Sequence, residues 1–557
     1  MPEPAAPPQP APNAAGAEDG AGAEGAAGAG GVAGAAGGAT GGRPGGVDAY
    51  GDGAAPDGAA ADILGEPAPD AGAVARRGGL PRVPTGVGGL DHLLMGGLVA
   101  GRTTLVVGSS GSGKTLLSSQ ILHNATAAGV PSVFVSFEER AADVIRNVAT
   151  MGWDFAAASD SGVLQIVDAS PDPGTVVAGG GYDLSGIILQ VRAAVAENDA
   201  ELVVLDSLGG LFSQYDDAGV LRRELVRLRN VLQELGCTGM MTAERTEEHG
   251  SISKHGVEDF VADCVIVLRQ ELIAERVRRT AQVYKLRGDR HHHGGFPFAI
   301  EVPEGIVVLP LSAAQLSQSS SDERIAFGNE AFDKMAGGGL FRDSIVLATG
   351  PTGGGKTLLC TTFAAHGCKT GDRSLYLGYE ESRSQLGRNA RNWGYDFDRW
   401  EADGLLRVRC GYPEGRSLEG HLLEIRRQIE NFRPSRVVID SISALERTAT
   451  PRTFREFLIG LSSYLKRERI CTVLTSTSPH MGGRPGKTGA DISTLTDAII
   501  LLRYLDIDDE LGRGLTIIKM RGSQHEKRVR RFRIDDAGLH LGGTVQDVRD
   551  MVAGLPG

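Results

Sequence analysis

The sequence predicts an α/β protein with two tandem domains, each a mostly parallel β-sheet flanked by helices. The first observation is a change of texture after residue 78, where short Val/Leu/Ile runs begin to alternate with longer stretches of helical periodicity. Thr103–Val107, Leu116–Ala128 and Val133–Phe137 give the first strand, helix and strand, and this alternation is typical of parallel strands joined by helices. The second observation is that these landmarks recur further along the chain, which indicates a duplicated domain.

The repeat is most visible in the string G-x-x-x-x-G-K-T, which begins at Gly108 and again at Gly350, 242 residues later. Other landmarks keep this spacing: Asp91 with Asp333, Glu138-Glu139 with Glu380-Glu381, and the G-[WY]-D-F strings at Gly152 and Gly394. Further on, the spacing falls to 234 residues, as in Asp206 with Asp440 and Lys285 with Lys519. We therefore expect the second domain to be eight residues shorter between its acidic pair and the strand that ends in Asp440.

Composition sets the limits of the two domains. Residues 1–78 are dominated by Ala, Gly and Pro, so they bury too little apolar surface to offset the entropy of ordering, and a disordered tail is predicted. Residues 312–324 contain a Ser/Gln-rich run with the composition of a linker. The predicted domains are therefore 79–311 and 325–543, followed by a short tail at 544–557.

Bulk properties disfavour several classes of protein. The formal net charge of -12 argues against nucleic-acid binding, which depends on clustered Lys and Arg, and the basic run Lys527–Arg533 alternates like a half-buried strand. No run approaches the roughly 18–20 apolar residues of a membrane span and no signal peptide is visible, so a cytoplasmic protein without membrane attachment is expected. Six cysteines without C-x-x-C spacing indicate reduced thiols. Three consecutive side chains at His291–His293 would point in different directions, so no metal site is predicted there.

Each G-x-x-x-x-G-K-T string follows an apolar strand, at Thr104–Val107 and Ser344–Ala348, and precedes a helical pattern. This is the context of an ATP-binding P-loop, in which backbone N–H groups and Lys hold the phosphates and the Thr hydroxyl can ligate magnesium. A Gly-rich turn that precedes Lys-Thr by chance is the alternative, and the strand–loop–helix context disfavours it. The candidate contacts with ATP and Mg2+ are Gly108, Gly111, Ser112, Gly113, Lys114, Thr115 and Leu116, and then Gly350, Thr352, Gly353, Gly354, Gly355, Lys356, Thr357 and Leu358.

A buried apolar strand that ends in Asp-Ser follows each P-loop, as LVVLDS at Asp206 and VVIDS at Asp440. The acid would hold magnesium, together with the hydroxyl of Thr115 or Thr357. A strand that ends in Asp at a turn is common for structural reasons, but these acids lie 98 and 90 residues after the first P-loop glycine, as a RecA-type sheet requires. The sequence therefore predicts two RecA-like P-loop ATPase domains.

The pairs Glu138-Glu139 and Glu380-Glu381 follow the strands VFVSF and SLYLGY. Adjacent carboxylates repel each other, so stability does not favour them, whereas a carboxylate near the γ-phosphate can deprotonate an attacking water or hydroxyl. A solvated acidic turn at the start of a helix is the plain alternative, and its recurrence in both domains weakens it. One member of each pair is predicted to be the general base.

Two short cationic strings occupy matching places late in each domain. Lys285-Leu-Arg-Gly is followed by His291, and Lys519-Met-Arg-Gly is followed by His525. The plain interpretation is a β-turn with exposed cations. The functional hypothesis is that these cations reach across a subunit boundary to the ATP of a neighbour, as arginines often do in phosphoryl transfer.

Between Pro84 and Gly542 the chain resembles the KaiC family of circadian-clock ATPases and autokinases. The shared strings are more specific than a P-loop: FEE at Phe137, DASPDP at Asp168, GGYDLS at Gly180, YEES at Tyr379, DISTLTDAIILL at Asp491 and KMRGSQHEK at Lys519. The resemblance implies a double-ringed homohexamer with ATP at the subunit interfaces of both rings. It also implies a slow ATPase in the first ring and a kinase and phosphatase in the second.

The resemblance carries residue roles with it. It implies phosphorylation at Ser493 and Thr494, with Thr488 at a further family hydroxyl position; without it, Ser493-Thr494 reads as a helix-capping pair. Glu380 would be base and magnesium ligand, Trp393 would lie beside adenine and Arg447 would face the phosphates. The resemblance also implies nucleotide contacts near the end of each domain. In the first domain these are Lys285, Leu286, Arg287 and His291, together with the earlier Thr150. In the second domain they are Arg513, Lys519, Met520, Arg521, Ser523, His525 and Lys527.

The sequence departs from the family pattern in three places. His293 replaces a Lys, which removes a fixed charge from the nucleotide grip of the first ring, and Gln524 replaces an aromatic residue. The sequence ends at Gly557, where clock-type members continue into the tail that docks KaiA, and this argues against control by KaiA. The segment Gly179–Ile188 resembles the KaiB-binding region, so a KaiB-like partner is expected there.

Three functional hypotheses follow. The leading one is a homohexameric ATPase and serine/threonine autokinase that acts in timing or signalling, with hydrolysis mainly in the first domain and phosphotransfer mainly in the second. The second is a nucleotide-gated signalling scaffold without significant kinase activity. The third is a RecA-like DNA-processing ATPase, which the acidic balance disfavours.

Overall fold

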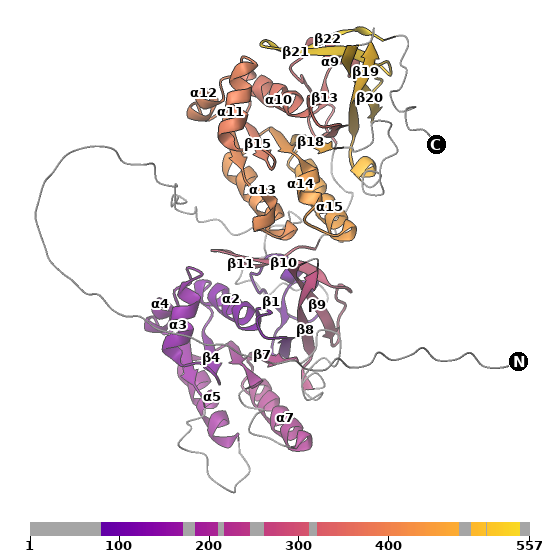
Figure 1. Ribbon diagram of the computed structural model, residues 1–557. Helices are drawn as coiled ribbons and strands as arrows, with labels where there is room; N and C mark the ends of the chain where they lie inside the picture. Colours follow the sequence, from indigo (N-terminus) through magenta and orange to yellow (C-terminus); the bar gives the residue numbers. More distant parts are fainter. Residues whose placement is uncertain are drawn as a thin grey trace, which may run out of the picture. The chain divides into compact units, whose positions relative to one another are not determined.

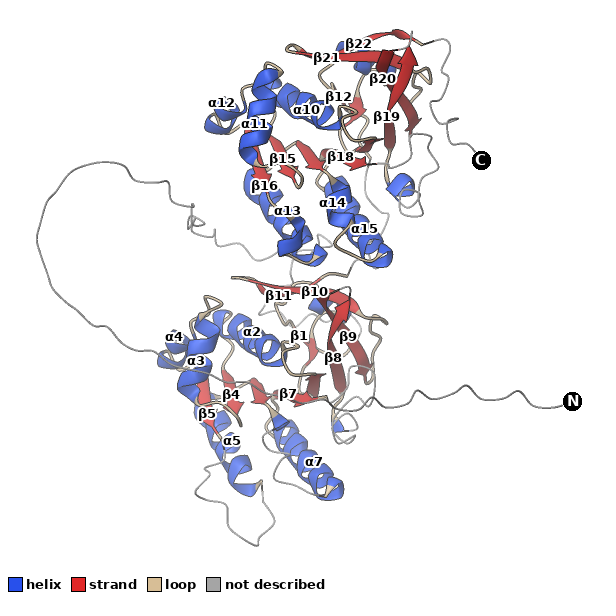
Figure 2. Cartoon of the chain, in the orientation of Figure 1, coloured by secondary structure: helices blue, strands red, loops and turns tan. Residues whose placement is uncertain are grey.

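The computed structural model describes residues 79–170, 184–209, 217–245, 261–273, 275–310, 320–477, 492–507 and 510–545. The predicted tail at 1–78, the first part of the predicted linker, Gly179–Asp183, Thr488 and residues 546–557 lie outside the described residues. Within them, the chain forms two nine-stranded sheets with helices on both faces, which confirms the predicted fold class (Figures 1 and 2).

The sheet of the first domain has the strand order β11-β10-β9-β8-β3-β7-β6-β4-β5. Strands β3 to β8 run parallel, and β9, β10 and β11 extend the sheet in antiparallel pairs. The bounds are β3 Thr103–Gly108, β4 Ser132–Ser136, β5 Leu164–Asp168, β6 Leu202–Asp206, β7 Thr238–Glu244, β8 Cys264–Ile273, β9 Arg276–Leu286, β10 Phe296–Glu301 and β11 Gly305–Val308.

The sheet of the second domain repeats this plan in the order β16-β15-β17-β18-β14-β19-β20-β21-β22. Strands β14 to β19 run parallel, and β20, β21 and β22 are antiparallel. The bounds are β14 Ile345–Gly350, β15 Ser374–Gly378, β16 Leu406–Cys410, β17 Arg436–Asp440, β18 Cys471–Thr477, β19 Ala498–Ile507, β20 Glu510–Met520, β21 Arg530–Asp535 and β22 Gly538–Thr544.

Helices cover both faces of each sheet because the central strands are apolar on both faces. In β4, Phe134 packs with residues of α2, α3 and α4, whereas Val133 and Val135 pack with residues of α5 and α7. Figure 1 shows these helices around the first sheet. In β15, Tyr376 faces α10, α11 and α12, and its neighbours face α13, α14 and α15. The bounds are α2 Lys114–Ala127, α3 Ala141–Ala149, α4 Phe155–Asp160, α5 Ser185–Asn198, α7 Ala218–Glu234, α10 Lys356–Thr370, α11 Arg383–Asn392, α12 Phe397–Ala402, α13 Leu418–Phe432, α14 Ile442–Glu446 and α15 Pro451–Arg467.

A short hairpin-like element precedes each P-loop strand. In the first domain β1 (Arg82–Val83) pairs with β2 (Leu98–Val99), and α1 (Leu90–Leu93) lies between them in sequence. In the second domain the matching elements are β12 Arg324–Ile325, α9 Glu330–Met335 and β13 Leu340–Phe341.

Several repeated residues have structural roles. Asp91 accepts a hydrogen bond from the backbone N–H of Thr85 at 2.8 Å, and Asp333 accepts one from Phe327 at 2.7 Å. The Asp of each G-[WY]-D-F string caps the helix that follows it, α4 or α12. The constant spacing of these landmarks therefore reports the duplicated fold and carries no information about catalysis.

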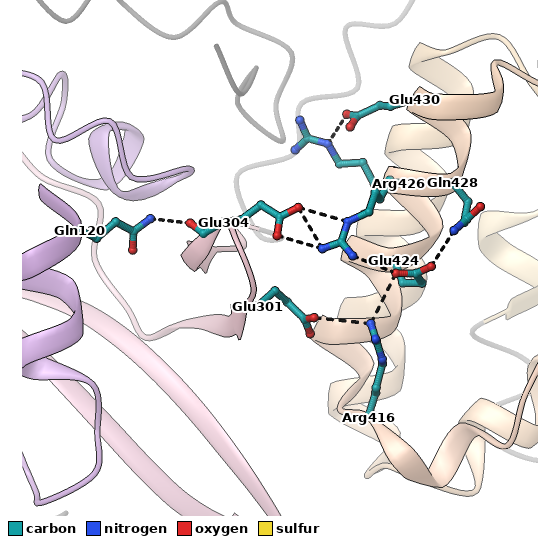
Figure 3. A network of polar contacts seen from close by, with 9 residues as sticks. Gln120, Glu301, Glu304, Arg416, Glu424, Arg426, Gln428 and Glu430 are labelled. Carbon is teal, nitrogen blue, oxygen red and sulfur yellow. Dashed lines mark hydrogen bonds and ion pairs between the residues drawn. The ribbon is translucent and has the colours of Figure 1, made fainter. Parts of the chain in front are cut away.

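Carboxylates at the turn between β10 and β11 pair with arginines of the second domain (Figure 3). Glu304 accepts hydrogen bonds from Arg427 of α13 at 3.1 and 2.9 Å, and Glu301 lies 3.5 Å from Arg416. Gln120 of α2 donates to the backbone carbonyl of Glu304 at 2.8 Å, which ties this turn to the helix that follows the first P-loop (Figure 3). Because the paired side chains are partly exposed, each ion pair contributes little to stability.

The structure also tests the predictions for the cysteines and for the basic run near the end of the second domain. The six cysteines are free thiols, as their spacing indicates. The strand predicted at Lys527–Arg533 begins only at Arg530, so that prediction is wrong for its first residues, which lie in the turn before β21. Among the helices that the structure describes, none has both the length and the apolar character needed to cross a membrane.

Candidate functional site

Each P-loop connects a buried strand to a helix that begins at its Lys. Strand β3 ends at Gly108 and α2 begins at Lys114, while β14 ends at Gly350 and α10 begins at Lys356. The residue before each helix is a glycine with left-handed backbone, with φ of 100° at Gly113 and 99° at Gly355. A glycine provides no side-chain cap, so the first N–H groups of both helices are left available to an anion.

The first glycine of each loop is needed for close packing. A Cβ at Gly108 would lie 2.7 Å from the carbonyl oxygen of Leu268, and a Cβ at Gly350 would lie 2.5 Å from that of Leu502. Both contacts are with the next strand of the sheet, so no other residue fits without moving the backbone. Packing therefore requires these two glycines, and their role in admitting phosphate stays a prediction.

The P-loop lysines lie over their own loops. Lys114 donates to the carbonyl of Ser109 at 3.0 Å, and Lys356 donates to those of Gly350 and Pro351 at 3.0 and 2.9 Å. Both lysines are buried. Burial lowers the pKa of Lys356, and the charges of Asp440 and Glu380 oppose that change. The buried cation is therefore held by two carbonyls of its own loop and experiences the charges of two carboxylates.

Four other residues predicted to contact ATP make backbone hydrogen bonds within the loop or bury their side chains. The N–H groups of Ser112 and Gly354 donate to carbonyls within the loop, at 3.2 and 3.1 Å. Ser112 is fully buried and its hydroxyl has no hydrogen-bond partner among the described residues. Leu358 belongs to the core of its domain and Leu116 packs against that of the first. These side chains shape the loop, and only their backbone could touch a nucleotide.

Asp206 and Asp440 each end a strand at the carboxyl edge of their own sheet. One strand, β7 or β18, separates each acid's strand from the P-loop strand. Asp206 accepts hydrogen bonds from the hydroxyls of Thr242 and Thr115. Asp440 accepts from Thr475 at 2.5 Å and from the hydroxyl of Tyr376 at 2.8 Å. Burial raises the pKa of Asp206, and the hydrogen bonds from Thr242 and Thr115 oppose that rise.

Magnesium fits the donor set of these sites. Each site offers a buried carboxylate, a P-loop threonine hydroxyl and a nearby glutamate, all of them hard oxygen donors. The side chain of Thr115 already reaches Asp206, so the two predicted ligands of the first site lie together. Among the described residues no cluster of His, Cys, Asp and Glu forms a separate metal site.

The two acids of each pair face different partners. Glu138 accepts a hydrogen bond from Ser207 at 2.6 Å, and Glu380 accepts one from Ser441 at 2.7 Å. These serines directly follow Asp206 and Asp440, so the first acid of each pair is held beside the strand-ending carboxylate. This placement favours Glu138 and Glu380 as the members of the pairs that face the reaction.

The second acids are turned toward the following helix. Glu139 accepts from Asn147 at 2.9 Å and Glu381 accepts from Asn389 at 3.0 Å. Burial and the charge of Asp440 raise the pKa of Glu381. Glu139 and Glu381 therefore anchor helices α3 and α11 as well as standing next to the first acids.

Arg447 follows helix α14 and lies near the predicted base. Its Nη1 is 3.8 Å from Oε1 of Glu380, and most of its side chain is exposed. An exposed arginine at this distance can turn between the carboxylate and a phosphate without breaking a buried contact.

The cations of the two strings Lys285-Leu-Arg-Gly and Lys519-Met-Arg-Gly, called here the late cations, bind the segments that precede β8 and β19. Lys285 donates to the carbonyl of Ala262 at 2.8 Å, and Lys519 donates to those of Ser493 and Thr496 at 2.6 and 2.7 Å. Arg287 and Arg521 pair with the acids one position later, Asp263 at 3.5 Å and Asp497 at 3.6 Å. The two domains therefore use these cations in the same way.

The Ser493 and Thr494 segment is tied to these cations. Both residues lie in a helical turn just before β19, with Ser493 partly buried and Thr494 exposed. Arg521 donates to the carbonyl of Thr494 at 2.8 Å. The backbone of the predicted phosphorylation sites is thus held by Lys519 and Arg521.

The remaining predicted contacts lie in β20 and in the segment that follows it. Arg513 donates to the carbonyl of Gly353 in the P-loop of its own chain at 3.4 Å. Ser523 accepts from Arg324 at 2.7 Å, and the Nε2 of His525 is buried without a hydrogen-bond partner among the described residues. Lys527 is exposed. These residues share one region of the antiparallel end of the second sheet.

Five other predicted contacts lie elsewhere, three of them in or against the cores. Leu286 is buried in the first domain, and Met520 and Trp393 pack against the core of the second. Thr150 donates to the carbonyl of Asn147 at 2.6 Å. His291 stacks edge-on against His293, and burial, followed by His293 and His292, lowers its pKa.

Sequence reasoning missed the residues that orient the acids. Ser207 and Ser441 were visible, because a serine follows the strand-ending Asp in both domains. Asn147 and Asn389 keep the spacing of 242 residues and could have been found by it. Thr242 and Thr475 are 233 residues apart, which breaks the pattern, and Tyr376 has no counterpart because the first domain has Phe134 there.

Comparison with known proteins identifies the family of this chain. A family model described as "ATPase: KaiC" matches residues 83–313 and 325–544. The chain is 47% identical over 479 residues to the circadian clock protein KaiC3 of Synechocystis sp., covering 86% of this chain and 95% of that protein. It is 46% identical to the circadian clock oscillator protein KaiC of Parathermosynechococcus lividus, over 86% of this chain and 88% of the relative.

A third relative gives a similar figure. The chain is 45% identical over 478 residues to the circadian clock oscillator protein KaiC of Synechococcus elongatus, which covers 86% of this chain and 92% of that protein. The family model and the relatives span both P-loop domains. The chain therefore belongs to the KaiC family of ATPases, with one copy of the family domain in each half of the sequence.

Proposed function

We propose that the chain is a magnesium-dependent ATP hydrolase and a serine/threonine autokinase that acts in the cytoplasm as a timing or signalling protein. Hydrolysis is assigned mainly to the first domain and phosphotransfer, with its possible reversal, to the second. The observation that carries the proposal is the arrangement of the second site, where Lys356 lies beside Asp440 and Glu380. The Ser493–Thr494 backbone is held by cations of the same domain.

The residues of the second site have separable roles in this proposal. Lys356 and the N–H groups at the start of α10 bind the phosphates. Glu380, oriented by Ser441 at 2.7 Å, accepts the proton of the attacking hydroxyl. Arg447 balances charge on the transferred phosphoryl group. Magnesium, when bound by Thr357, Asp440 and Glu380, would draw charge from the phosphate oxygens.

The first site has the same frame but lacks hydroxyls at the two positions that match the predicted phosphorylation sites. At the positions that match Ser493 and Thr494, 234 residues earlier, the chain has Asp259 and Phe260. Glu138, oriented by Ser207 at 2.6 Å, would then act on water, with Thr115 and Asp206 as the magnesium ligands. This difference in acceptors supports hydrolysis in the first domain.

The assembly proposed is a homohexamer with ATP between subunits in both rings, as the family resemblance implies. Lys285, Arg287, Lys519 and Arg521 would then reach the nucleotide of a neighbouring subunit. A KaiB-like protein is the partner proposed for the first domain, and control by KaiA is not proposed.

Mass spectrometry after incubation of the full chain with Mg-ATP tests the kinase half. Phosphate is expected on Ser493 and Thr494, and the Ser493→Ala, Thr494→Ala double variant is the matched control because it keeps both P-loops. If the wild-type chain hydrolyses ATP and gains no phosphate at either residue, the protein is a nucleotide-gated scaffold instead. Negative-stain images with and without ATP test the hexamer, and monomers in both conditions would remove the trans-acting roles.

A further inference from the structure

Tyr376 touches the strand-ending carboxylate of the second site. It lies in the middle of β15 and its side chain is almost fully buried. Its hydroxyl donates to Oδ2 of Asp440 at 2.8 Å, while Thr475 donates to Oδ1. Both oxygens of this carboxylate are therefore held by buried hydroxyl donors from the two strands that flank β17.

The hydroxyl of Tyr376 acts as a donor. A carboxylate oxygen only accepts hydrogen bonds, so in the 2.8 Å contact with Oδ2 of Asp440 the tyrosine hydroxyl is the donor. A buried carboxylate with a donor on each oxygen cannot rotate without losing a hydrogen bond, and an unmade hydrogen bond in a buried site is costly. The plane of the Asp440 carboxylate is thus fixed before any cation binds.

The first domain lacks this contact. In β4 the residue opposite Val204 of β6 is Phe134, and in β15 the residue opposite Val438 of β17 is Tyr376. The aromatic side chains of Phe134 and Tyr376 therefore occupy the same place in their sheets, and the two residues are 242 positions apart in the sequence. Phe134 is fully buried and has no polar atom, so the carboxylate of Asp206 takes its donors from other residues.

We infer that Tyr376 is a positioning residue specific to the second site, which orients Asp440 toward the divalent cation that accompanies ATP. This inference rests on the proposed magnesium site. Groups that hydrogen-bond to a metal-ligating carboxylate typically change metal affinity by about 10- to 100-fold when they are removed. The two ATP sites of one chain therefore differ in how firmly they hold the cation.

The substitution that isolates the hydroxyl is Tyr376→Phe. We expect this variant to fold, because the fully buried Phe134 already fills the same place in the first domain. The matched control is Tyr395→Phe, which removes a hydroxyl that donates to Thr362 at 3.3 Å in the same domain. All the full-length chains carry Lys114→Ala, so that the first P-loop does not bind nucleotide.

The measurement is the affinity for Mn2+, followed by electron paramagnetic resonance with a saturating non-hydrolysable ATP analogue. Tyr376→Phe is expected to weaken Mn2+ binding by about tenfold or more, while Tyr395→Phe leaves it unchanged. Affinity for the nucleotide in EDTA is expected to stay within about twofold in both variants, because the hydroxyl acts through Asp440.

Two results would overturn the inference. One is equal Mn2+ affinity in Tyr376→Phe and in the parent chain, and the other is an equal loss of nucleotide affinity in EDTA, which indicates general damage to the site. A parent chain that binds the nucleotide without taking up Mn2+ contradicts the proposed magnesium site itself, so the two failures are distinguishable.

Discussion

In the first domain Glu138 and Asp206 lie beside Ser207, and in the second Glu380 and Asp440 lie beside Ser441, with hydroxyl–carboxylate distances of 2.6 and 2.7 Å. The surroundings of these frames differ. In the second domain the hydroxyl of Tyr376 also binds Asp440, and Lys519 and Arg521 hold the backbone carbonyls of Ser493 and Thr494. The comparison teaches that the duplicated frame keeps its acids and serines in both domains, while hydroxyl groups differ at a few positions. In the proposed function, these hydroxyl groups would separate hydrolysis from phosphotransfer.

The largest effect is expected when the proposed base of one domain is neutralised. Glu380→Gln keeps the shape and the contact with Ser441 but loses the proton acceptor, so phosphorylation of Ser493 and Thr494 should fall by about 10²- to 10⁴-fold. Glu381→Gln, whose carboxylate faces Asn389, should cost less than about tenfold. Equal losses in the two variants, measured by single-turnover phosphorylation, would show that the pair is not divided as the geometry indicates.

The next effect separates the two P-loops. Lys356→Ala removes the buried cation beside Asp440, and phosphorylation should fall by about 10²- to 10³-fold, the usual size for a charge that stabilises a transition state. Lys114→Ala should instead lower steady-state ATP hydrolysis and spare phosphotransfer in the fraction that keeps its assembly by size-exclusion chromatography. Loss of both activities in both variants would contradict the division of labour.

A smaller effect is expected from the serines that orient the bases. Ser441→Ala removes the 2.7 Å hydrogen bond to Glu380, and Ser207→Ala removes the 2.6 Å bond to Glu138. Because these glutamates are partly exposed and water can replace the donor, each rate should fall by only about tenfold. Ser443→Ala, whose hydroxyl contacts Ser476, is the control. A loss of both rates from either single variant would mean that the serines stabilise the fold generally.

The smallest effect concerns the ion pairs between the domains. Burial raises the pKa of Glu301 despite the nearby Arg416 and Arg427. A raised pKa in the folded state means that the folded chain binds this proton more readily, so the ionised group costs stability at neutral pH and the cost disappears as pH falls through that pKa. Glu301→Gln should therefore match or exceed the wild type by less than about 1 kcal/mol at pH 7.

The same variant gives a test of sign. The advantage of Glu301→Gln in free energy of unfolding should shrink as pH is lowered toward 4, measured by denaturant titration. An advantage that grows on acidification would mean that the pKa of Glu301 is lowered in the folded chain. Arg427→Ala, which leaves Glu301 in place, should change the unfolding free energy by no more than about 1 kcal/mol at either pH.

Much of the fold and site could be predicted because duplication makes local patterns visible twice. Strand–loop–helix order, the P-loop glycines and lysines, and the Asp-ended strands are all set by short stretches of sequence. The strand predicted at Lys527–Arg533 is correct only from Arg530 onward. A short alternating run does not show where a turn ends and where pairing with β22 begins. The orienting partners of the acids come from other strands and helices, so no local pattern contains them.

The sequence by itself determined that the chain has two P-loop domains of one design, since spacing, periodicity and glycine positions are properties of contiguous residues. Only the tertiary structure decided that Glu138 and Glu380 face the strand-ending acids while Glu139 and Glu381 face asparagines. It also decided that Tyr376 reaches Asp440, because these residues lie 64 positions apart and meet only through the register of β15 and β17. Sheet register joins side chains from distant segments, and the physical reason is that backbone hydrogen bonding between strands, rather than sequence distance, fixes which side chains become neighbours.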